Sequence, residues 1–311
     1  MRNTAIILFL VLSVISIPGV LKYKNPRAII SCWGDSLTSG TAKGVSTPYP
    51  KMLQILALKN LDIRAVTNNG IEGMTSTQIA SKFGAKPPLM TVAGGVIPAS
   101  GEVAIESTTH SNLSSKSNYG KLKYSGSLAG VPGMLSVDWN EQAPDLAGTT
   151  KFKRAKSGDP VAASPNTPFI IDQADWTSSV VVIWSGRNDI LSKLSNETIV
   201  ENIELMINSL KDNDHFVVMG VTDAIFESSE SAEFKQIVEL NKQLSEKYPE
   251  HWIDIRATLV GSYNPASSDD MVAFNSGKIP PSLLIDGLHL NDAGNKIVAS
   301  TVYDFIKAKG W

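Results

Sequence analysis

Four short segments of the chain combine glycine turns with side chains that could perform acyl-transfer chemistry. One contains Ser36, and the last contains both Asp286 and His289. A serine hydroxyl is a weak nucleophile until a base removes its proton, and imidazole is the side chain best suited to that task near neutral pH. A carboxylate that accepts a hydrogen bond from the imidazole Nδ1–H fixes the tautomer and stabilises the imidazolium. We therefore expect Ser36, His289 and Asp286 to be nucleophile, general base and orienting carboxylate.

The same segments contain donors for the negative charge that would develop in such a reaction. A tetrahedral oxyanion needs hydrogen-bond donors that are arranged in advance, such as the backbone N–H of a glycine turn or a side-chain amide. Gly73, in the sequence NNGIEG at 68–73, and Asn188, in SGRND at 185–189, fit these two roles. The backbone N–H of Ser36 is a third candidate donor.

Each segment taken alone also has a purely structural explanation. The sequence GDSL at 34–37 suits a strand-to-helix turn with a helix cap, and SGRND suits the start of a helix. NNGIEG suits a tight turn, while Asp286 and His289 could be turn residues before the last helix. These explanations do not account for the joint occurrence of all four segments, in order and beside the ends of predicted strands.

The elements that would position these residues alternate between strand and helix. Apolar runs typical of buried parallel strands occupy residues 27–33, 63–67, 179–184, 216–221 and 252–255. Apolar residues at helical spacing occupy residues 49–58, 75–83, 196–210, 229–247 and 292–309. This order predicts an α/β fold, a doubly wound parallel sheet of five strands flanked by helices. Ligands bind beyond the carboxyl ends of such strands, where the polar segments lie.

Residues 86–175 interrupt this alternation. A connection of about 90 residues is far too long for a loop inside a compact sheet. Short alternating stretches, punctuated by Gly, Ser and Pro, predict a small inserted β subdomain of antiparallel strands. Expected strands are 96–97 and 103–105, paired as a hairpin, and 121–125, 134–139 and 151–154. The α/β domain is therefore expected to be discontinuous, with residues 25–85 and 176–311 on either side of the insertion.

Composition excludes several other classes of protein. The 311 residues are 42% hydrophobic and carry a net charge of −2, which is ordinary for a folded globular chain. Twenty-eight Lys and Arg against 30 Asp and Glu leave no basic excess for phosphate groups, so nucleic acid is not an expected partner. A single cysteine, Cys32, excludes an internal disulfide, and four scattered histidines argue against a zinc site. We expect Cys32 to be a small buried apolar residue.

Residues 1–24 have the pattern of an export segment, either a signal peptide or an N-terminal membrane anchor. Arg2 precedes an uncharged, largely apolar run that extends to Leu21, and Lys22 follows it. Such a charged start and apolar centre is typical of an export signal, and the run is just long enough to span a bilayer. We expect an exported chain, secreted or periplasmic, that is either released or tethered to a membrane through residues 5–21.

Four blocks of the sequence together resemble the motif blocks of the SGNH (GDSL) hydrolase family. They are GDSLTSG at 34–40, NNGIEGMTS at 68–76, SGRND at 185–189 and DGLHLND at 286–292. The resemblance implies a flavodoxin-like fold and hydrolysis of carboxylic esters through an acyl-enzyme. By motif position it implies Ser36 as nucleophile, with Asp286 and His289 completing the triad. It also implies Gly73 and Asn188 as oxyanion-hole residues, and no metal or organic cofactor.

The insertion and the export segment lead to a substrate hypothesis. Tyr119, Tyr124 and Trp139 of the insertion could stack on sugar rings, so the leading candidate is an O-acyl group, above all acetyl, on an extracytoplasmic carbohydrate. The same aromatic residues could instead form the core of the subdomain. Two alternatives stay open: a lipid esterase, lysophospholipase or thioesterase, and a glycan-binding module whose hydrolase site is vestigial.

An acidic pair, Asp269 and Asp270, and the single residue Arg187 are not assigned a role in catalysis. Asp269 and Asp270 are expected in a polar surface loop, since no other metal ligands accompany them. Arg187 is expected in solvent, although it could also contact an anionic substrate or pair with an acid near Asp189.

Overall fold

The computed structural model describes residues 28–108, 121–138, 150–173 and 176–311. The predicted export segment, residues 1–24, lies outside this part of the chain. Within the described part, no helix is both long and apolar enough to cross a membrane.

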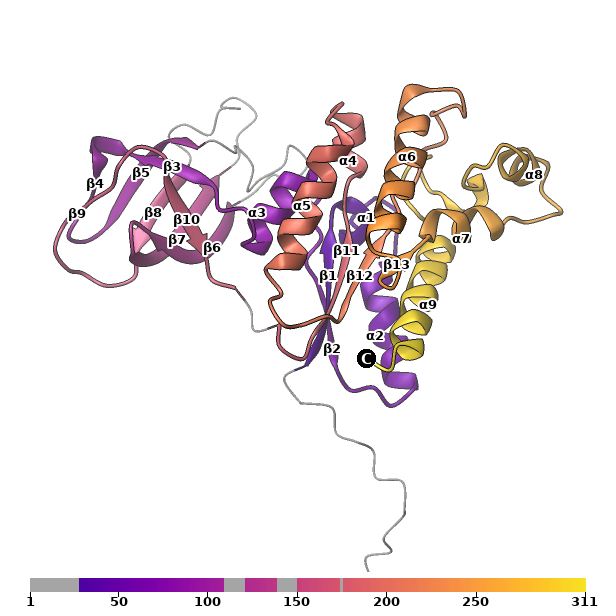
Figure 1. The fold of residues 1–311 in the computed structure, drawn as a ribbon, viewed down its shortest axis with the longest axis horizontal. Coiled ribbons are helices and arrows are strands. Elements are labelled where there is room, and N and C mark those ends of the chain that lie inside the picture. The colour runs from indigo at the N-terminus through magenta and orange to yellow at the C-terminus, as the bar shows by residue number, and fades with distance from the viewer. Residues whose placement is uncertain (1–27, 109–120, 139–149, 174–175) are drawn as a thin grey trace, which may run out of the picture.

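The centre of the molecule is the predicted five-stranded parallel sheet, which is confirmed (Figure 1). Its strand order is β13-β12-β11-β1-β2, and every neighbouring pair is parallel. Numbered along the chain within this sheet, the order is 2-1-3-4-5, the flavodoxin-like arrangement of doubly wound folds. The strands are β1 (Ile29–Gly34), β2 (Ala65–Asn68), β11 (Val180–Trp184), β12 (Phe216–Met219) and β13 (Trp252–Ile253).

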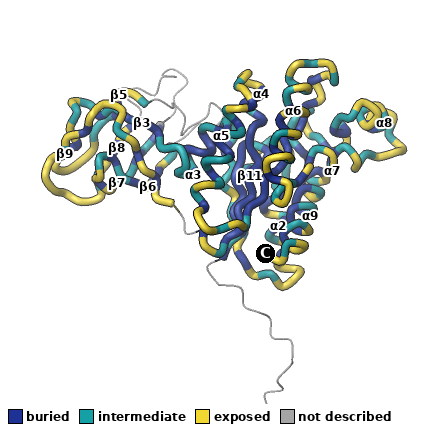
Figure 2. Tube along the Cα trace, viewed as in Figure 1, coloured by how far each residue is buried: buried dark blue, intermediate teal, exposed yellow. Residues whose placement is uncertain are grey.

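Helices cover both faces of the sheet, because its central strands are apolar on both sides. Val180 and Val182 of β11 pack in one hydrophobic cluster, whereas Val181 and Ile183 pack in the other. Figure 2 shows β11 as a continuously buried strand between the helices. The first cluster includes residues of α2 (Tyr49–Lys59), α7 (Ile255–Gly261) and α9 (Asp292–Ala308), and the second includes residues of α3 (Ser76–Phe83), α5 (Asn196–Asn208) and α6 (Ala232–Lys247).

The insertion folds as a closed antiparallel barrel with its own hydrophobic cluster, so the predicted β subdomain is confirmed. It lies to one side of the sheet, beyond α3 and α5 (Figure 1). Around the barrel the order is β10-β3-β5-β8-β7-β6. Its strands are β3 (Leu89–Val92), β5 (Glu102–Thr108), β6 (Lys121–Leu128), β7 (Val131–Asp138), β8 (Thr150–Arg154) and β10 (Thr167–Ile171).

The hairpin expected between residues 96–97 and 103–105 is wrong. Strand β4 (Val96–Ile97), which follows the short 3₁₀ turn Ala93–Gly95, pairs instead with β9 (Val161–Ala162). The residues after β4 do not form a hairpin turn, because their carbonyl groups bond to a distant segment. The Arg154 guanidinium donates to the Pro98 carbonyl, and the Gly158 N–H donates to the Ala99 carbonyl.

The C-terminal third contains two helices that the sequence patterns did not predict. The strand expected to reach residue 255 stops at Ile253, because Asp254 caps α7 by accepting a hydrogen bond from the Ala257 N–H. The expected loop around Asp269 and Asp270 is the start of α8 (Ser268–Asn275), so that prediction is wrong. The Asp270 carboxylate is buried and accepts hydrogen bonds from Asn264 and Ser282, the latter in the 3₁₀ turn Pro281–Leu283.

Candidate active site

Ser36 is the first residue of α1 (Ser36–Ser39), directly after β1. Asp35 caps this short helix, with its Oδ1 atom accepting from the Leu37 N–H at 2.9 Å. Gly34 has no room for a side chain, since a Cβ atom there would lie 2.2 Å from Thr38 Oγ1 and 2.4 Å from the Trp184 carbonyl oxygen. This tight turn places the serine hydroxyl at the carboxyl edge of the sheet.

The three residues predicted to form a triad come together across more than 250 positions of sequence. Ser36 Oγ lies 2.8 Å from His289 Nε2, and His289 Nδ1 lies 2.7 Å from Asp286 Oδ2. The other carboxylate oxygen, Asp286 Oδ1, accepts from the backbone N–H groups of Leu288 and His289. Gly287, with φ of 84°, allows the chain to fold back so that the Asp286 carboxylate meets the His289 ring. The geometry is that of a serine, a base and an orienting carboxylate in series.

The Asp286 carboxyl is held in its ionised form. Partial burial acts to raise its pKa, but the hydrogen bonds from the backbone and ring of His289, and from the Leu288 N–H, outweigh burial and lower the pKa below its usual range. The carboxylate is therefore available to stabilise a positive charge on the imidazole.

The two predicted oxyanion donors lie in the segments that follow β2 and β11, the strands on either side of β1 in the sheet. Gly73 follows β2 and has φ of 69°, and Asn188 lies in α4 (Arg187–Leu191), directly after β11. The Asn188 side-chain amide donates to the Met74 carbonyl at 3.0 Å. Because an amide group carries two hydrogens, this bond orients Asn188 against residues 70–74, which we call the glycine loop, and leaves a second N–H for a ligand.

The glycine loop is fixed against the helix that carries Ser36. The Ile71 N–H donates to the Gly34 carbonyl at 3.1 Å. A Cβ atom on Gly70 would lie 2.3 Å from the Ser39 backbone nitrogen and 2.8 Å from the Asp35 carbonyl oxygen. Only glycine permits this backbone contact, which sets the distance between the loop and the serine.

Two acids beside these residues are buried, which sequence patterns did not predict. Asp189, next to Asn188, accepts from the backbone and hydroxyl of Ser76 at the start of α3, and Asn202 donates to the same hydroxyl. Burial raises the pKa of Asp189 and also that of Asp35, the latter to about 7. Asp35 Oδ2 has no hydrogen-bond partner in the described part of the chain. In the sequence, the only indication of these two buried acids is their position inside the motif blocks GDSLTSG and SGRND.

A family model described as GDSL-like Lipase/Acylhydrolase matches residues 30–302. The chain belongs to this family. This GDSL hydrolase is therefore an enzyme that cleaves carboxylic esters, as its motif blocks predicted. No protein of curated function matches the chain.

Solved structures that match this chain at low sequence identity include three proteins. A psychrotrophic esterase from Pseudoalteromonas sp., inhibited by monoethylphosphonate, is 13% identical over 90% of this chain and 97% of its own, with a TM-score of 0.48. The lipase/acylhydrolase from Enterococcus faecalis is 14% identical over 91% and 96%, with a TM-score of 0.48. A member of the lipolytic G-D-S-L family from Veillonella parvula is 12% identical over 89% and 97%, with a TM-score of 0.49.

Arg187 and Cys32 are both buried, which decides two predictions made from the sequence. Arg187 is not in solvent: only 3% of its side chain is exposed, and it forms an ion pair with the equally buried Glu227. That expectation is wrong, since the partner lies 40 residues away and has no signature in the local sequence. Cys32 is fully buried in β1, which confirms its prediction as a small apolar residue.

The aromatic residues considered for sugar stacking give no exposed platform among the described residues. Tyr124 is 8% exposed and belongs to the hydrophobic cluster of the barrel, which is the alternative that the sequence left open. Tyr119 and Trp139 lie outside the described part of the chain.

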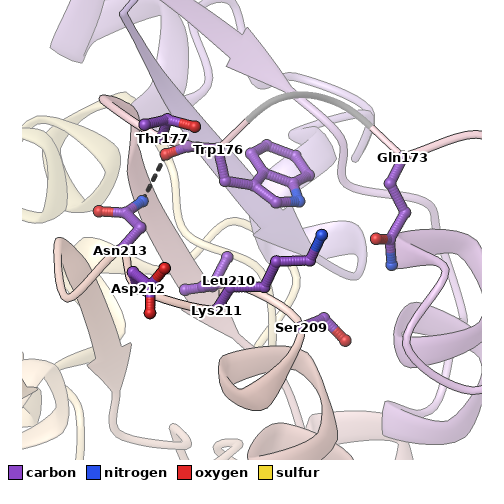
Figure 3. Close-up of a pocket in the computed structure, with 8 residues that line it drawn as sticks. All are labelled: Gln173, Trp176, Thr177, Ser209, Leu210, Lys211, Asp212 and Asn213. Carbon is purple, nitrogen blue, oxygen red and sulfur yellow. Dashed lines mark hydrogen bonds between the residues drawn. The ribbon is translucent and has the colours of Figure 1, made fainter.

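A cavity of about 220 Å³ lies away from this edge, between the barrel and the amino ends of β11 and β12. Figure 3 shows its lining, where the Asn213 amide donates to the Trp176 carbonyl. Within the described ranges, no group of three or more His, Cys, Asp or Glu residues is arranged to hold a metal ion.

Proposed function

We propose that Ser36, His289 and Asp286 are the catalytic triad of this ester hydrolase. Ser36 Oγ attacks the acyl carbonyl carbon while its proton passes to His289 Nε2, and a tetrahedral oxyanion forms. The bond to the alcohol oxygen then breaks, and His289 returns the proton to that oxygen. A water molecule attacks the acyl-enzyme by the same route, which releases the acid and restores Ser36 Oγ–H. Asp286 stabilises the imidazolium in both steps.

The oxyanion is held by the backbone N–H groups of Ser36 and Gly73 and by the side-chain amide of Asn188. These donors are fixed before substrate binds, because the glycine loop is pressed against α1 and Asn188 is bonded to Met74. Preorganised donors of this kind need no rearrangement as charge develops, which is why they contribute strongly to catalysis.

The observation that carries this proposal is the continuous hydrogen-bonded series from Ser36 through His289 to Asp286. Its test is hydrolysis of p-nitrophenyl acetate by Ser36→Ala, for which no turnover above the buffer rate is expected. Ser39→Ala is the matched control, because Ser39 lies in the same helix and its hydroxyl bonds to the Ser36 carbonyl and to Thr41 rather than to His289. Full activity of Ser36→Ala would overturn the proposal.

For the substrate, our first candidate is an O-acyl group, above all acetyl, on an extracytoplasmic carbohydrate. Two features support it: the uncharged apolar run through residues 5–21, which favours export or a membrane tether, and a barrel beside the catalytic domain that could present a polymer (Figure 1). Release of acetate from acetylated polysaccharides, with Ser36→Ala as the blank, tests this candidate.

A second candidate, an ester with a longer hydrocarbon chain such as a lipid ester, is favoured by two exposed apolar side chains near the triad. Ile225 and Phe226 are 49% and 64% exposed. The Ile225 N–H donates to the carbonyl of Gly287, which lies between Asp286 and His289. A series of p-nitrophenyl esters from acetyl to decanoyl separates the candidates: kcat/KM falls with chain length for a deacetylase and rises for a lipid esterase.

A further inference from the structure

The segment from Thr222 to Glu227, which follows β12, buries its polar residues beside the active site. Thr222 and Asp223 are 1% exposed and Glu227 is 3% exposed. Buried charges are costly unless they are paired, so the partners of these residues indicate what the segment is for. We call residues 222–227 the brace.

The brace is bonded to the residue next to Asn188. The Arg187 guanidinium makes a two-pronged ion pair with the Glu227 carboxylate, and Arg187 Nη1 also donates to the Thr222 carbonyl at 2.9 Å. Glu227 Oε2 accepts in addition from the Ala224 N–H at 2.8 Å, which closes the brace on itself. Planar, two-pronged pairs of this kind fix orientation as well as distance.

The same brace is bonded to the loop that carries the histidine. The Ile225 N–H donates to the Gly287 carbonyl at 2.7 Å. A Cβ atom on Gly287 would lie 2.3 Å from Ile225 Cγ2, so the Ile225 side chain packs directly against this glycine. The brace therefore contacts both the segment of Asn188 and the loop of Asp286 and His289.

Further contacts hold the brace in place. Asp223 Oδ1 accepts from Arg256 Nε at 2.8 Å, and the Lys278 ammonium donates to the Ile225 carbonyl at 2.8 Å. A buried ion pair contributes little net stability compared with apolar residues of the same size, because two charges lose their hydration. Stability is thus a weak reason for burying Arg187 and Glu227 at this position.

We propose that Arg187 and Glu227 are positioning residues, which set Asn188 and the His289 loop at the mutual distance that oxyanion stabilisation requires. This inference rests on the function proposed above, because it assigns the pair an effect through Asn188 and His289. A displacement of about 1 Å in a reacting group costs roughly 10²-fold in rate. We therefore expect Glu227→Gln to lower kcat by about 10–100-fold, with KM within about twofold of wild type.

A loss of stability alone must be separated from a loss of position. The control is Asp62→Asn, which breaks a second, largely buried ion pair, Arg64–Asp62, whose side chains are 4% and 16% exposed. That pair lies before β2, at the opposite end of the sheet from Ser36. We expect Asp62→Asn to lower Tm by an amount similar to Glu227→Gln while leaving kcat within about twofold of wild type. An equal loss of kcat in both variants would overturn the proposal.

The decisive measurement is a double-mutant cycle with Asn188→Ala. If Glu227 acts through Asn188, the double variant has nearly the kcat of Asn188→Ala alone, because the donor to be positioned is already missing. Effects that multiply would show an independent structural role and would overturn the proposal. A fully active Ser36→Ala would contradict the proposed function instead, so the two failures are distinguishable.

A second variant covers the case in which Glu227→Gln does not fold. Arg187→Met combined with Glu227→Met leaves no buried charge without a partner and keeps the packed volume similar. We expect this double variant to fold, with kcat still at least about 10-fold below wild type. Full activity of the folded variant would overturn the proposal.

Discussion

Each end of the sheet has an arginine paired with a carboxylate in or near the protein interior, but the surroundings of the two pairs differ. At the amino ends of the strands, Arg64 pairs with Asp62, only two residues away, and donates to the Trp311 carbonyl. The Trp311 indole stacks on His215 and His251, so aromatic groups from distant parts of the chain pack together at this end. This end holds the chain together and presents no arrangement of nucleophile and base among the described residues.

Buried polar atoms without a hydrogen-bond partner in the described part of the chain occur at both ends. At the amino ends they are Trp176 Nε1 and the Tyr248 hydroxyl, whereas the carboxyl ends have a larger group that includes Asp35 Oδ2, Ser185 Oγ, Arg187 Nε and Thr222 Oγ1. Incompletely satisfied polar groups are costly and tend to occur at functional sites. At the carboxyl end these atoms surround the motif residues, which favours a functional role for that end of the sheet.

Removing a histidine at either end gives the largest predicted contrast. His289→Ala lowers kcat by about 10⁴-fold or more, because the serine loses its base. His251→Ala removes an imidazole that stacks on Phe216 at 3.9 Å between ring centres and bonds to its carbonyl, so it lowers Tm and leaves kcat near wild type. Steady-state kinetics and thermal unfolding of the two variants measure this contrast. Comparable kcat values in His289→Ala and His251→Ala would contradict this prediction.

Asparagine provides a second matched pair. Asn188→Ala lowers kcat by about 10²–10³-fold, since one preorganised oxyanion donor is lost. Asn213→Ala, before β12, removes hydrogen bonds to the carbonyls of Trp176 and Ser179 and should affect only unfolding. The check is kcat on one ester for both variants after folding is verified by circular dichroism. Unchanged kcat in Asn188→Ala would remove Asn188 from the oxyanion hole.

The buried Asp35 carboxyl, at the carboxyl end of β1, is predicted to make the free energy of unfolding depend on pH. Burial raises its pKa from 3.8 to about 7, so between these values the folded chain keeps a proton that the unfolded chain has released. This residue's contribution to stability therefore falls as pH rises from about 4 to 7. Asp35→Asn does not titrate, so its free energy of unfolding should gain about 2–4 kcal/mol relative to wild type between pH 4 and pH 8.

Urea unfolding of both proteins across that pH range measures the Asp35 effect. A difference between variant and wild type that stays constant with pH would show that Asp35 is ionised throughout. Asp62→Asn, at the amino end, is the companion variant for which no such gain is expected.

The smallest predicted effect concerns the apolar side chains near the triad. Phe226→Ser should lower the ratio of kcat/KM for hexanoyl over acetyl esters by about three- to tenfold if the hydrocarbon chain contacts Phe226, since each buried methylene is worth roughly fourfold. Leu58→Ser is the control, because Leu58 is 53% exposed in α2, away from the loops that carry the triad. An unchanged ratio would favour the acetylated carbohydrate over the lipid ester.

Sequence patterns predicted the sheet and the residues at its carboxyl edge because both depend on local signals. Buried parallel strands such as Val180–Trp184 are continuous apolar runs, and the turns after them carry the motif residues. The pairing of β4 with β9 and the ion pair of Arg187 with Glu227 depend on contacts across 40 residues or more. No local pattern encodes such contacts, and a charged residue is usually in solvent, which is why Arg187 was misplaced.

The start of α8 was missed for a related reason. Asp269 and Asp270 suit a loop by composition, but Ser267 caps a helix there and Asp270 is buried against Ser282, twelve residues further on. Asp35 was recognised only as a helix cap, since burial of its second oxygen depends on the packing of several loops.

The proposed mechanism requires Ser36 to become acylated during ester hydrolysis. The most direct measurement is rapid acid quenching of the enzyme with p-nitrophenyl acetate, followed by peptide mass spectrometry. We predict one acetyl group per chain, located on Ser36 and absent from Ser36→Ala. An acetyl group on another residue, or an acylated intermediate that persists in Ser36→Ala, would contradict the claim.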